Sequence, residues 1–211
     1  MKIRKLISSI ICGAVVLSFA GCTKTEPSSP APSQDPAEVE TEAAIEVTEA
    51  QPADNSDDIF VSAYLAFAVT SESLHNGKWD EITANTTDGQ NASPQLSWEP
   101  VEGATTYVIY MIDMNTAYFI HWRSGGITET TLPEGWATSA DYIGPYPPPG
   151  STHQYNVYVF ALKNPVERVK GGVNSISPKV QEFMDSLDTD ADGNTGNIIA
   201  VGRVMGNYTA K

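Results

Sequence analysis

The chain has 211 residues and a formal net charge of −14 at pH 7, from 12 basic and 26 acidic side chains. No basic stripe or arginine-rich segment interrupts this excess of acid, which excludes nucleic acid as a class of partner. One of the two cysteines lies in a segment that we expect to be removed, so the mature chain is held by its core without an intrachain disulfide.

The N-terminal segment, residues 1–21, has the layout of a secretory signal peptide. A basic start, "MKIRK", precedes an almost wholly apolar stretch from Ile7 to Phe19, which is too short to span a membrane comfortably. The segment ends in "FAGC", which resembles the lipobox of bacterial lipoproteins, where the cysteine is lipidated and becomes the new N-terminus. We therefore expect a lipid on Cys22 that holds the protein on the extracytoplasmic face of the cell envelope. An ordinary signal peptide that happens to precede a cysteine is the alternative.

Residues 22–58 are predicted to form a disordered tether between the lipid and a folded domain. The stretch from residue 23 onward has no aromatic side chain and carries ten acids against Lys24 alone. Such a composition repels itself and cannot bury enough apolar area to offset the entropy of ordering. A helix over "EVETEAAIEVTEA" is the alternative.

The remaining residues, 59–211, are long enough for one domain, and their patterns predict a mainly β fold. Runs rich in β-branched and aromatic residues predict strands at 59–69, 105–113 and 155–162, and a closing strand with glycine interruptions at 197–208. Turn clusters rich in glycine, asparagine and proline separate these runs. We therefore expect an antiparallel β-sandwich.

One helix is predicted in the C-terminal region, packed at the edge of the sandwich. In "SISPKVQEFMDSLD", Ser177 can cap the helix and Pro178 suits its first turn. Four apolar residues then share one helix face, as in a helix with one buried side. They are Val180, Phe183, Met184 and Leu187.

Three polar side chains beside apolar runs are candidates for one pocket. Asp113 closes an apolar strand, His121 lies in a stretch otherwise fit for burial, and His153 comes just before a strand. A carboxylate can orient an imidazole by accepting its N–H, which raises the share of imidazolium. Two such imidazoles, with backbone N–H groups of glycine-rich turns, would form a small anion site. A structural role for each residue, as a buried histidine or a turn-capping aspartate, is the alternative.

The run "YIGPYPPPGSTHQY", residues 142–155, is predicted to form the wall of this pocket. Proline fixes φ and holds a loop open at low entropic cost. Gly144 and Gly150 would let the backbone approach a ligand closely. The alternative is a polyproline segment that docks in an aromatic groove of a partner protein.

The order of these motifs resembles the phosphatidylethanolamine-binding protein family, in its bacterial branch often called Raf kinase inhibitor-like. A "SPxLxW" turn leads to a strand ending in aspartate, a His-Trp pair follows, and "GPxPPxGxxHxY" precedes the closing strand. The resemblance extends over about residues 60–208 and implies a β-sandwich whose pocket accepts phosphate-like headgroups and similar anions. The matching positions are Ser93, Pro94, Leu96, Trp98, Gly103, Asp113, His121, Trp122, Gly144, Pro147, Pro148, Gly150, His153 and Tyr155.

We interpret the domain as a binding protein rather than an enzyme, with a small anionic or phosphate-bearing ligand. No Gly-x-Ser-x-Gly elbow is present, and the cysteine left after processing is needed for the anchor. Two alternatives stay open: an envelope protein–protein regulator, such as a protease or kinase inhibitor, that acts through surface loops, and a metal-dependent enzyme with its metal at the two histidines. The ligand-binding candidates are Asp113, His121, Trp122, Gly144, Pro147, Pro148, His153 and Tyr155, with a core position as the alternative for Trp122.

A further motif, "DTDADGNTGNII" at residues 188–199, copies the first half of a calcium loop. Asp188, Asp190 and Asp192 alternate before a glycine, so their carboxylates could converge on one cation at the bend. The twelfth position is Ile199 rather than the glutamate that completes such loops. We expect either a weak calcium site or an acidic turn between helix and strand, and no other cofactor.

Overall fold

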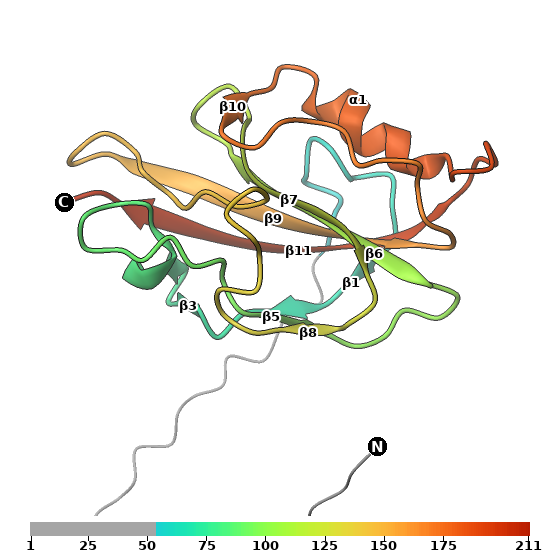
Figure 1. Ribbon diagram of the computed structural model, residues 1–211, viewed down its shortest axis with the longest axis horizontal. Coiled ribbons are helices and arrows are strands. Elements are labelled where there is room, and N and C mark those ends of the chain that lie inside the picture. The colour runs from blue at the N-terminus through green and yellow to red at the C-terminus, as the bar shows by residue number, and fades with distance from the viewer. Residues whose placement is uncertain (1–53) are drawn as a thin grey trace, which may run out of the picture. The chain divides into compact units, whose positions relative to one another are not determined.

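The structure is a computed structural model that describes residues 54–211. The predicted signal peptide, Cys22 and the predicted tether as far as residue 53 lie outside the described residues. Short and long strands alternate with turns along this part of the chain (Figure 1). The elements are β1 Ala66–Phe67, β2 Val69–Thr70, β3 Leu74–His75, β4 Lys78–Trp79, η1 Glu81–Thr83, β5 Leu96–Trp98, β6 Thr106–Asp113, β7 Phe119–Ile127, β8 Thr131–Leu132, β9 Thr152–Leu162, β10 Ser175–Ile176, α1 Val180–Asp185, η2 Ser186–Asp188 and β11 Ile198–Thr209.

The strands form a large sheet and a small sheet. The large sheet has the order β10-β7-β6-β9-β11-β4-β3, with β1 also paired to β11, and the small sheet has the order β2-β5-β8. The long central strands are antiparallel to one another. Two short strands, β1 and β4, pair with β11 in parallel, which the sequence does not predict.

Two apolar cores lie on the two faces of the large sheet, with α1 above it and β5 and β8 below it in Figure 1. Successive side chains of a strand point to opposite faces, so β6 contributes alternate residues to each core. Every residue of β6 is buried, as expected for a strand covered on both sides. The first core joins Tyr107, Ile109 and Met111 to Leu96, Trp98 and Leu132, and the second joins Val108, Tyr110 and Ile112 to Val180, Met184 and Leu187. The predicted β-sandwich is therefore confirmed.

The helix is shorter than the sequence predicts, although its apolar face is the predicted one. It begins at Val180, with Lys179 rather than Ser177 at the N-cap position. Met184 and Leu187 are buried with Val180. The helix covers the face of the large sheet opposite the small sheet, whereas the sequence predicts an edge position. Within residues 54–211, no helix has both the length and the apolar character needed to cross a membrane.

The first predicted strand, residues 59–69, forms turns and two short strands instead. Phe60 and Val61 are neighbours in the chain and both belong to the core under the helix, which the alternation of a strand does not permit. The Asp58 carboxylate accepts the backbone N–H groups of both residues, at 2.8 and 3.2 Å. An aspartate that captures nearby backbone donors favours a turn over a strand.

A buried ion pair holds residues 54–58 against β11 and corrects the predicted start of the domain. Arg203 donates to the Asp58 carboxylate at 2.8 Å and to the Asp54 carbonyl at 2.7 Å. The Tyr158 hydroxyl donates to the same Asp58 oxygen at 2.9 Å. Composition assigns these acids to the tether because it does not reveal that an arginine inside the fold pairs with them.

Replacing Arg203 by methionine is expected to lower the free energy of unfolding by about 3–5 kcal/mol, because Asp58 then remains as a buried charge without its partner. Urea denaturation measures the change. The double variant R203M/D58N should regain part of the loss, since the unpaired charge is removed.

The matched control for R203M is K179M, because Lys179 forms an exposed ion pair with Glu182. Exposed pairs contribute little to stability, so K179M should unfold close to the wild type. Equal losses in R203M and K179M would contradict a structural role for the buried pair.

Candidate ligand-binding site

The register of three neighbouring strands brings the central residues of the predicted pocket together. Asp113, the last residue of β6, pairs with Phe119 of β7 on one side and with Tyr155 of β9 on the other. Directly paired residues have neighbouring side chains on the same face of a sheet. These three side chains therefore form a row at one end of the large sheet, on the face that packs on the small sheet, since Tyr155 also belongs to that core.

His121 reaches this row through an irregularity in β7. Met111 pairs with Trp122 and Ile112 pairs with Ile120, so His121 is an extra residue in a register shift. A regular strand would place Ile120 and Trp122 on the same face of the sheet. Because of the shift, Ile120 packs in the core between the large sheet and α1, and Trp122 packs in the core between the large and small sheets. Trp122, a predicted ligand-binding residue, is therefore a core residue.

A cavity of about 420 Å³ lies over this row. The sequence predicts six of its lining residues: Asp113, His121, Pro147, Pro148, His153 and Tyr155. Four other lining residues are not among the predicted ligand-binding residues: Thr116, Phe119, Tyr146 and Pro149. Tyr146 and Pro149 belong to the run 142–155 that predicts the wall, so that run could have identified them. Thr116 and Phe119 depend on strand register and loop packing, which sequence patterns do not give.

An aspartate–histidine pair forms the polar end of the cavity. His153 Nδ1 lies 2.7 Å from Asp113 Oδ2, so the ring donates its Nδ1–H to the carboxylate. Asp113 also accepts the hydroxyl of Thr116 at 3.0 Å and the backbone N–H of Asn115 at 2.7 Å. The carboxylate therefore fixes the ring and its tautomer, and Nε2 is the ring nitrogen left for a ligand.

His121 is held by backbone carbonyls instead of a carboxylate. Its Nδ1 lies 2.8 Å from the Ile143 oxygen and 3.1 Å from the Gly144 oxygen. Because carbonyl oxygens only accept, Nδ1 carries the proton. Burial lowers the pKa of His121 below its ordinary value of 6.5, and the carbonyls and Asp113 oppose this only in part. The ring is therefore neutral at pH 7 and offers a lone pair at Nε2. The sequence predicts a greater share of imidazolium instead.

The Tyr155 hydroxyl is a buried donor with no hydrogen-bond partner among residues 54–211. The residue lines the cavity, and burial raises the pKa of its hydroxyl, so the group stays protonated. An unpaired buried polar group costs about 1–3 kcal/mol, and such groups are rare in native structures. The hydroxyl has almost no accessible surface, so it lies behind the cavity wall and is not open to the cavity itself.

Aromatic rings form the rim of the cavity. Tyr146 packs edge-on against Phe119 and His121, with ring centroids 5.8 and 5.7 Å apart. Its hydroxyl donates to Asn174 Oδ1 at 2.9 Å, which ties the proline-rich loop to the segment before β10. The cavity therefore combines a polar floor with an apolar rim.

Gly144 lies behind His121 and does not line the cavity. Its N–H donates to Asn91 Oδ1 at 2.6 Å and its carbonyl accepts from His121. A Cβ atom at this position would lie 2.0 Å from the Thr83 carbonyl oxygen, so only glycine fits. The N–H of Gly150 also donates within the fold, to Ala210. The predicted backbone contribution of these two glycines to an anion site is therefore not formed.

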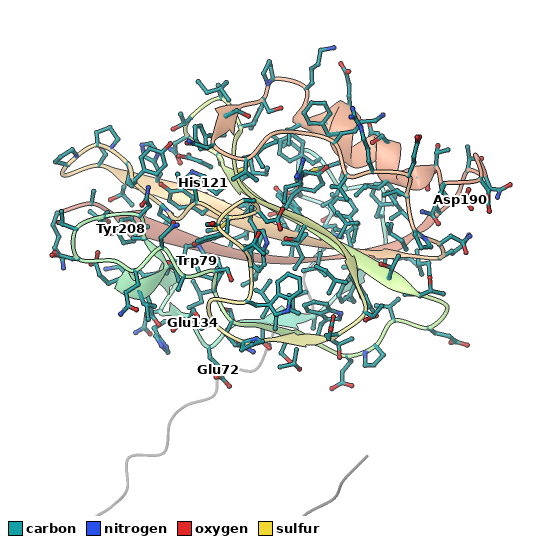
Figure 2. All side chains as sticks on the ribbon, in the orientation of Figure 1. Glu72, Trp79, His121, Glu134, Asp190 and Tyr208 are labelled. Carbon is teal, nitrogen blue, oxygen red and sulfur yellow. The ribbon has the colours of Figure 1, made fainter. Side chains whose placement is uncertain are left out.

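The predicted calcium loop lies at the opposite end of the domain from His121 (Figure 2). Asp190 accepts the backbone N–H groups of Asp192 and Asn194, at 3.0 and 2.8 Å. Asp188 accepts two further backbone N–H groups at 3.1 and 3.0 Å. Within residues 54–211, no three Asp, Glu, His or Cys side chains are grouped closely enough to hold a metal ion. The acids stabilise a turn, which is the alternative that the sequence offers.

The match to a family model agrees with the resemblance in sequence. The family model described as phosphatidylethanolamine-binding protein matches residues 70–209. Among solved structures, a homolog of phosphatidylethanolamine-binding protein from Chlamydia trachomatis is 22% identical, with 68% of this chain and 97% of that chain covered and a TM-score of 0.49. The comparison with curated proteins found no match.

The buried neutral state of His121 predicts a pH-dependent stability. Since the folded-state pKa lies below 6.5, the unfolded chain binds the proton more readily, and the free energy of unfolding should fall as the pH drops below about 6.5. Urea denaturation between about pH 5.5 and pH 7.5 measures this slope. The variant H121Q should show a flatter slope, whereas H75Q, which alters an exposed histidine, should keep the wild-type slope. Equal slopes in H121Q and the wild type would contradict this assignment.

Proposed function

The chain belongs to the phosphatidylethanolamine-binding protein family, since the family model matches residues 70–209, and from this premise we propose that its cavity binds a small anionic or phosphate-bearing group. Two imidazoles that line one cavity, each held through its Nδ1 by the protein, are the observation that carries the proposal. The bonds to Asp113 and to backbone carbonyls leave the Nε2 atom of each ring for a ligand.

The two histidines favour an acid that keeps one proton. Neutral His121 offers a lone pair at Nε2, so it can accept an O–H of the ligand. His153 is fixed by the bond of its Nδ1 to Asp113, and its Nε2 is the other ring nitrogen left for the ligand. A phosphomonoester near neutral pH exists partly as a monoanion with a P–O–H group. Such a P–O–H group matches the Nε2 acceptor that neutral His121 offers in this cavity.

The aromatic rim fits the part of the ligand that follows the anionic group. Phe119 and Tyr146 present apolar surface beside the polar floor. A cavity of about 420 Å³ is within the usual range for a small-molecule site. We propose binding without turnover, because the polar groups described here orient a ligand and the sequence offers no activated nucleophile.

The location of the protein and the alternative functions stay predictions of the sequence. Cys22 and the signal peptide would place the domain on the extracytoplasmic face of the envelope, attached through a lipid. A regulator of an envelope protein is the alternative function, and it would act through surfaces other than the cavity. A metal-dependent enzyme is less well supported, because Asp113 is bonded to His153 while His121 is bonded to carbonyls.

The double variant H121A/H153A is expected to lose the binding of inorganic phosphate and of O-phosphoethanolamine, because both imidazoles that line the cavity are removed. Isothermal titration calorimetry measures the loss. The control is H75A, since His75 is exposed on β3 and does not line the cavity. Unchanged phosphate binding in H121A/H153A would overturn the proposed function.

Binding of a phosphomonoester is expected to take up protons, because the complex holds a proton between the ligand and His121 that the free ring lacks at pH 7. Affinity should therefore rise as the pH falls from about 7.5 to about 6. Calorimetry in two buffers of different ionisation enthalpy measures the uptake directly. Proton release, or none, would show that the ligand binds as a dianion and does not bond to a neutral His121.

A further inference from the structure

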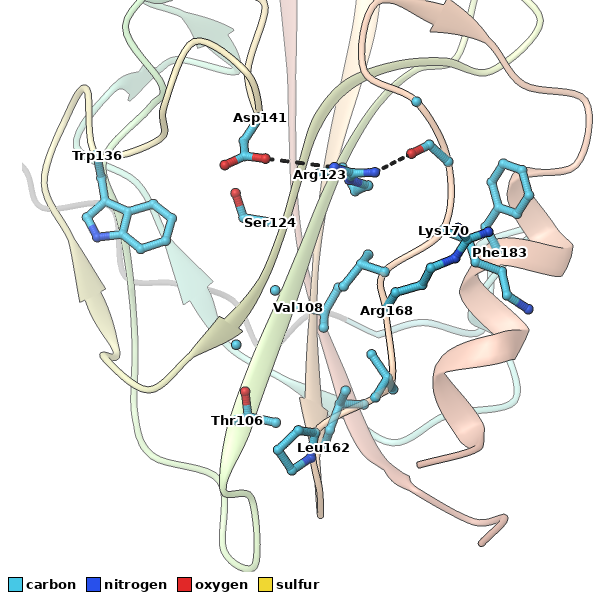
Figure 3. Close-up of a pocket in the computed structure, with 17 residues that line it drawn as sticks. Thr106, Val108, Arg123, Ser124, Trp136, Asp141, Leu162, Arg168, Lys170 and Phe183 are labelled. Carbon is cyan, nitrogen blue, oxygen red and sulfur yellow. Dashed lines mark hydrogen bonds and ion pairs between the residues drawn. The ribbon is translucent and has the colours of Figure 1, made fainter. Parts of the chain in front are cut away.

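A second cavity, of about 830 Å³, lies along the outer side of β7 (Figure 3). We call it the edge trough. Its floor is the end of β7 at residues 123–126, one wall carries Trp136 and Asp141, and the other wall is residues 165–172. It shares no lining residue with the cavity at His121.

The floor of the edge trough is an open edge of the large sheet. β10 pairs only with the first two residues of β7. Next along the edge, Trp122 forms a bridge with Tyr142, and the Arg123 N–H donates to the Asp141 carbonyl. Beyond Arg123, no strand within residues 54–211 pairs with the outer side of β7. Exposed strand edges pair readily with other chains, and most proteins cover them.

Two consecutive glycines leave the far end of this floor, beyond Arg123 and Ser124, without side chains. Gly125 and Gly126 are both exposed. A Cβ atom on Gly125 would lie 2.4 Å from Val169 Cγ2 on the opposite wall. Gly126 has a φ of +70°, which side-chain-bearing residues rarely adopt. These glycines also lie at a register shift, since Tyr107 pairs with Ile127 and Ile109 pairs with Ser124, so β7 bulges at the trough.

Both walls are fixed to the sheet, so the edge trough is formed before any ligand arrives. Arg123 donates to the Gly171 carbonyl and its Nη2 lies 3.9 Å from Asp141 Oδ1, as the dashed lines in Figure 3 show. The buried Tyr110 donates its hydroxyl to the Lys170 carbonyl at 2.7 Å. A preformed site loses less entropy when it binds.

Positive charge gathers around the edge trough in an otherwise acidic chain. Arg123, Arg168 and Lys170 line it, against Asp141 as the single lining carboxylate, while the whole chain has a net charge of −14. Arg168 and Lys170 lie on the wall opposite Trp136 (Figure 3). Both are exposed and form no ion pair within residues 54–211. The local field therefore favours a negatively charged partner.

We propose that the edge trough binds an extended peptide segment with acidic side chains, which adds as a strand to the outer edge of β7. The open edge offers main-chain hydrogen bonds, which give strand addition its affinity. Arg168 and Lys170 select acidic side chains on one side of the added strand, and Trp136 contacts the other. An extended backbone suits this site because the edge continues past Arg123 and its last two floor residues, Gly125 and Gly126, carry no side chains.

A labelled synthetic peptide with the sequence of residues 38–50, "EVETEAAIEVTEA", is a suitable probe because acidic residues recur among β-branched ones. Fluorescence anisotropy measures its binding to the purified chain. The variant R168Q/K170Q should weaken binding by about tenfold or more, since two rim charges are removed. The control K78Q removes an exposed lysine of β4 that lies outside the edge trough and should bind as the wild type does. A peptide with glutamine in place of every glutamate should bind weakly.

Hydrogen exchange locates the peptide. Addition of a strand should slow exchange of the Gly125 and Gly126 amides, because they lie on the floor of the edge trough. Binding that survives in H121A/H153A separates this proposal from the proposed function of the other cavity. Binding that appears only after deletion of residues 38–50 would identify the chain's own segment as the occupant. Equal binding to the wild type and R168Q/K170Q, or no protection at the two glycines, would overturn the proposal.

Discussion

The register of β6 between β7 and β9 is the constraint on which the candidate site depends. It pairs Asp113 with Phe119 on one side and with Tyr155 on the other. β6 is buried on both faces, so a slip of β6 by one residue would exchange its side chains between the two cores and move Asp113 away from Phe119 and Tyr155. The apolar cores that stabilise the fold therefore also fix the geometry of the cavity.

The strands that the sequence predicts correctly are those in which the composition of the run alone decides the structure. The runs at 105–113, 155–162 and 197–208 are long and rich in β-branched residues, and each contains most of an observed strand. Residues 59–69 have similar composition, but Asp58 captures two backbone N–H groups and turns the chain. β7 was not predicted as a strand because a register shift at His121 and two glycines interrupt its pattern.

The sequence predicts which residues line the site better than it predicts their protonation and orientation. The motifs identify both histidines and Asp113, yet they do not reveal that His121 bonds to backbone carbonyls and is neutral. The His-Trp pair of the motif makes Trp122 a candidate for the ligand with a core position as the alternative, and the register shift shows that the core position is the correct one. Tyr155 was predicted from the motif, whereas its unpaired hydroxyl follows from burial. Tertiary contacts decide protonation and orientation, and a single sequence does not encode them locally.

The stretch from residue 165 to Asn174 lines one cavity and contacts a rim residue of the other. It forms one wall of the edge trough, and Asn174 accepts the hydroxyl of Tyr146 at the rim of the other cavity. The backbone N–H of Asn174 also donates to the Ile120 carbonyl, one residue before His121. A ligand that shifts Tyr146 therefore acts on the same stretch that a peptide in the edge trough contacts. Thermodynamic linkage requires any cooperativity between the two sites to be mutual: each ligand changes the affinity for the other by the same factor.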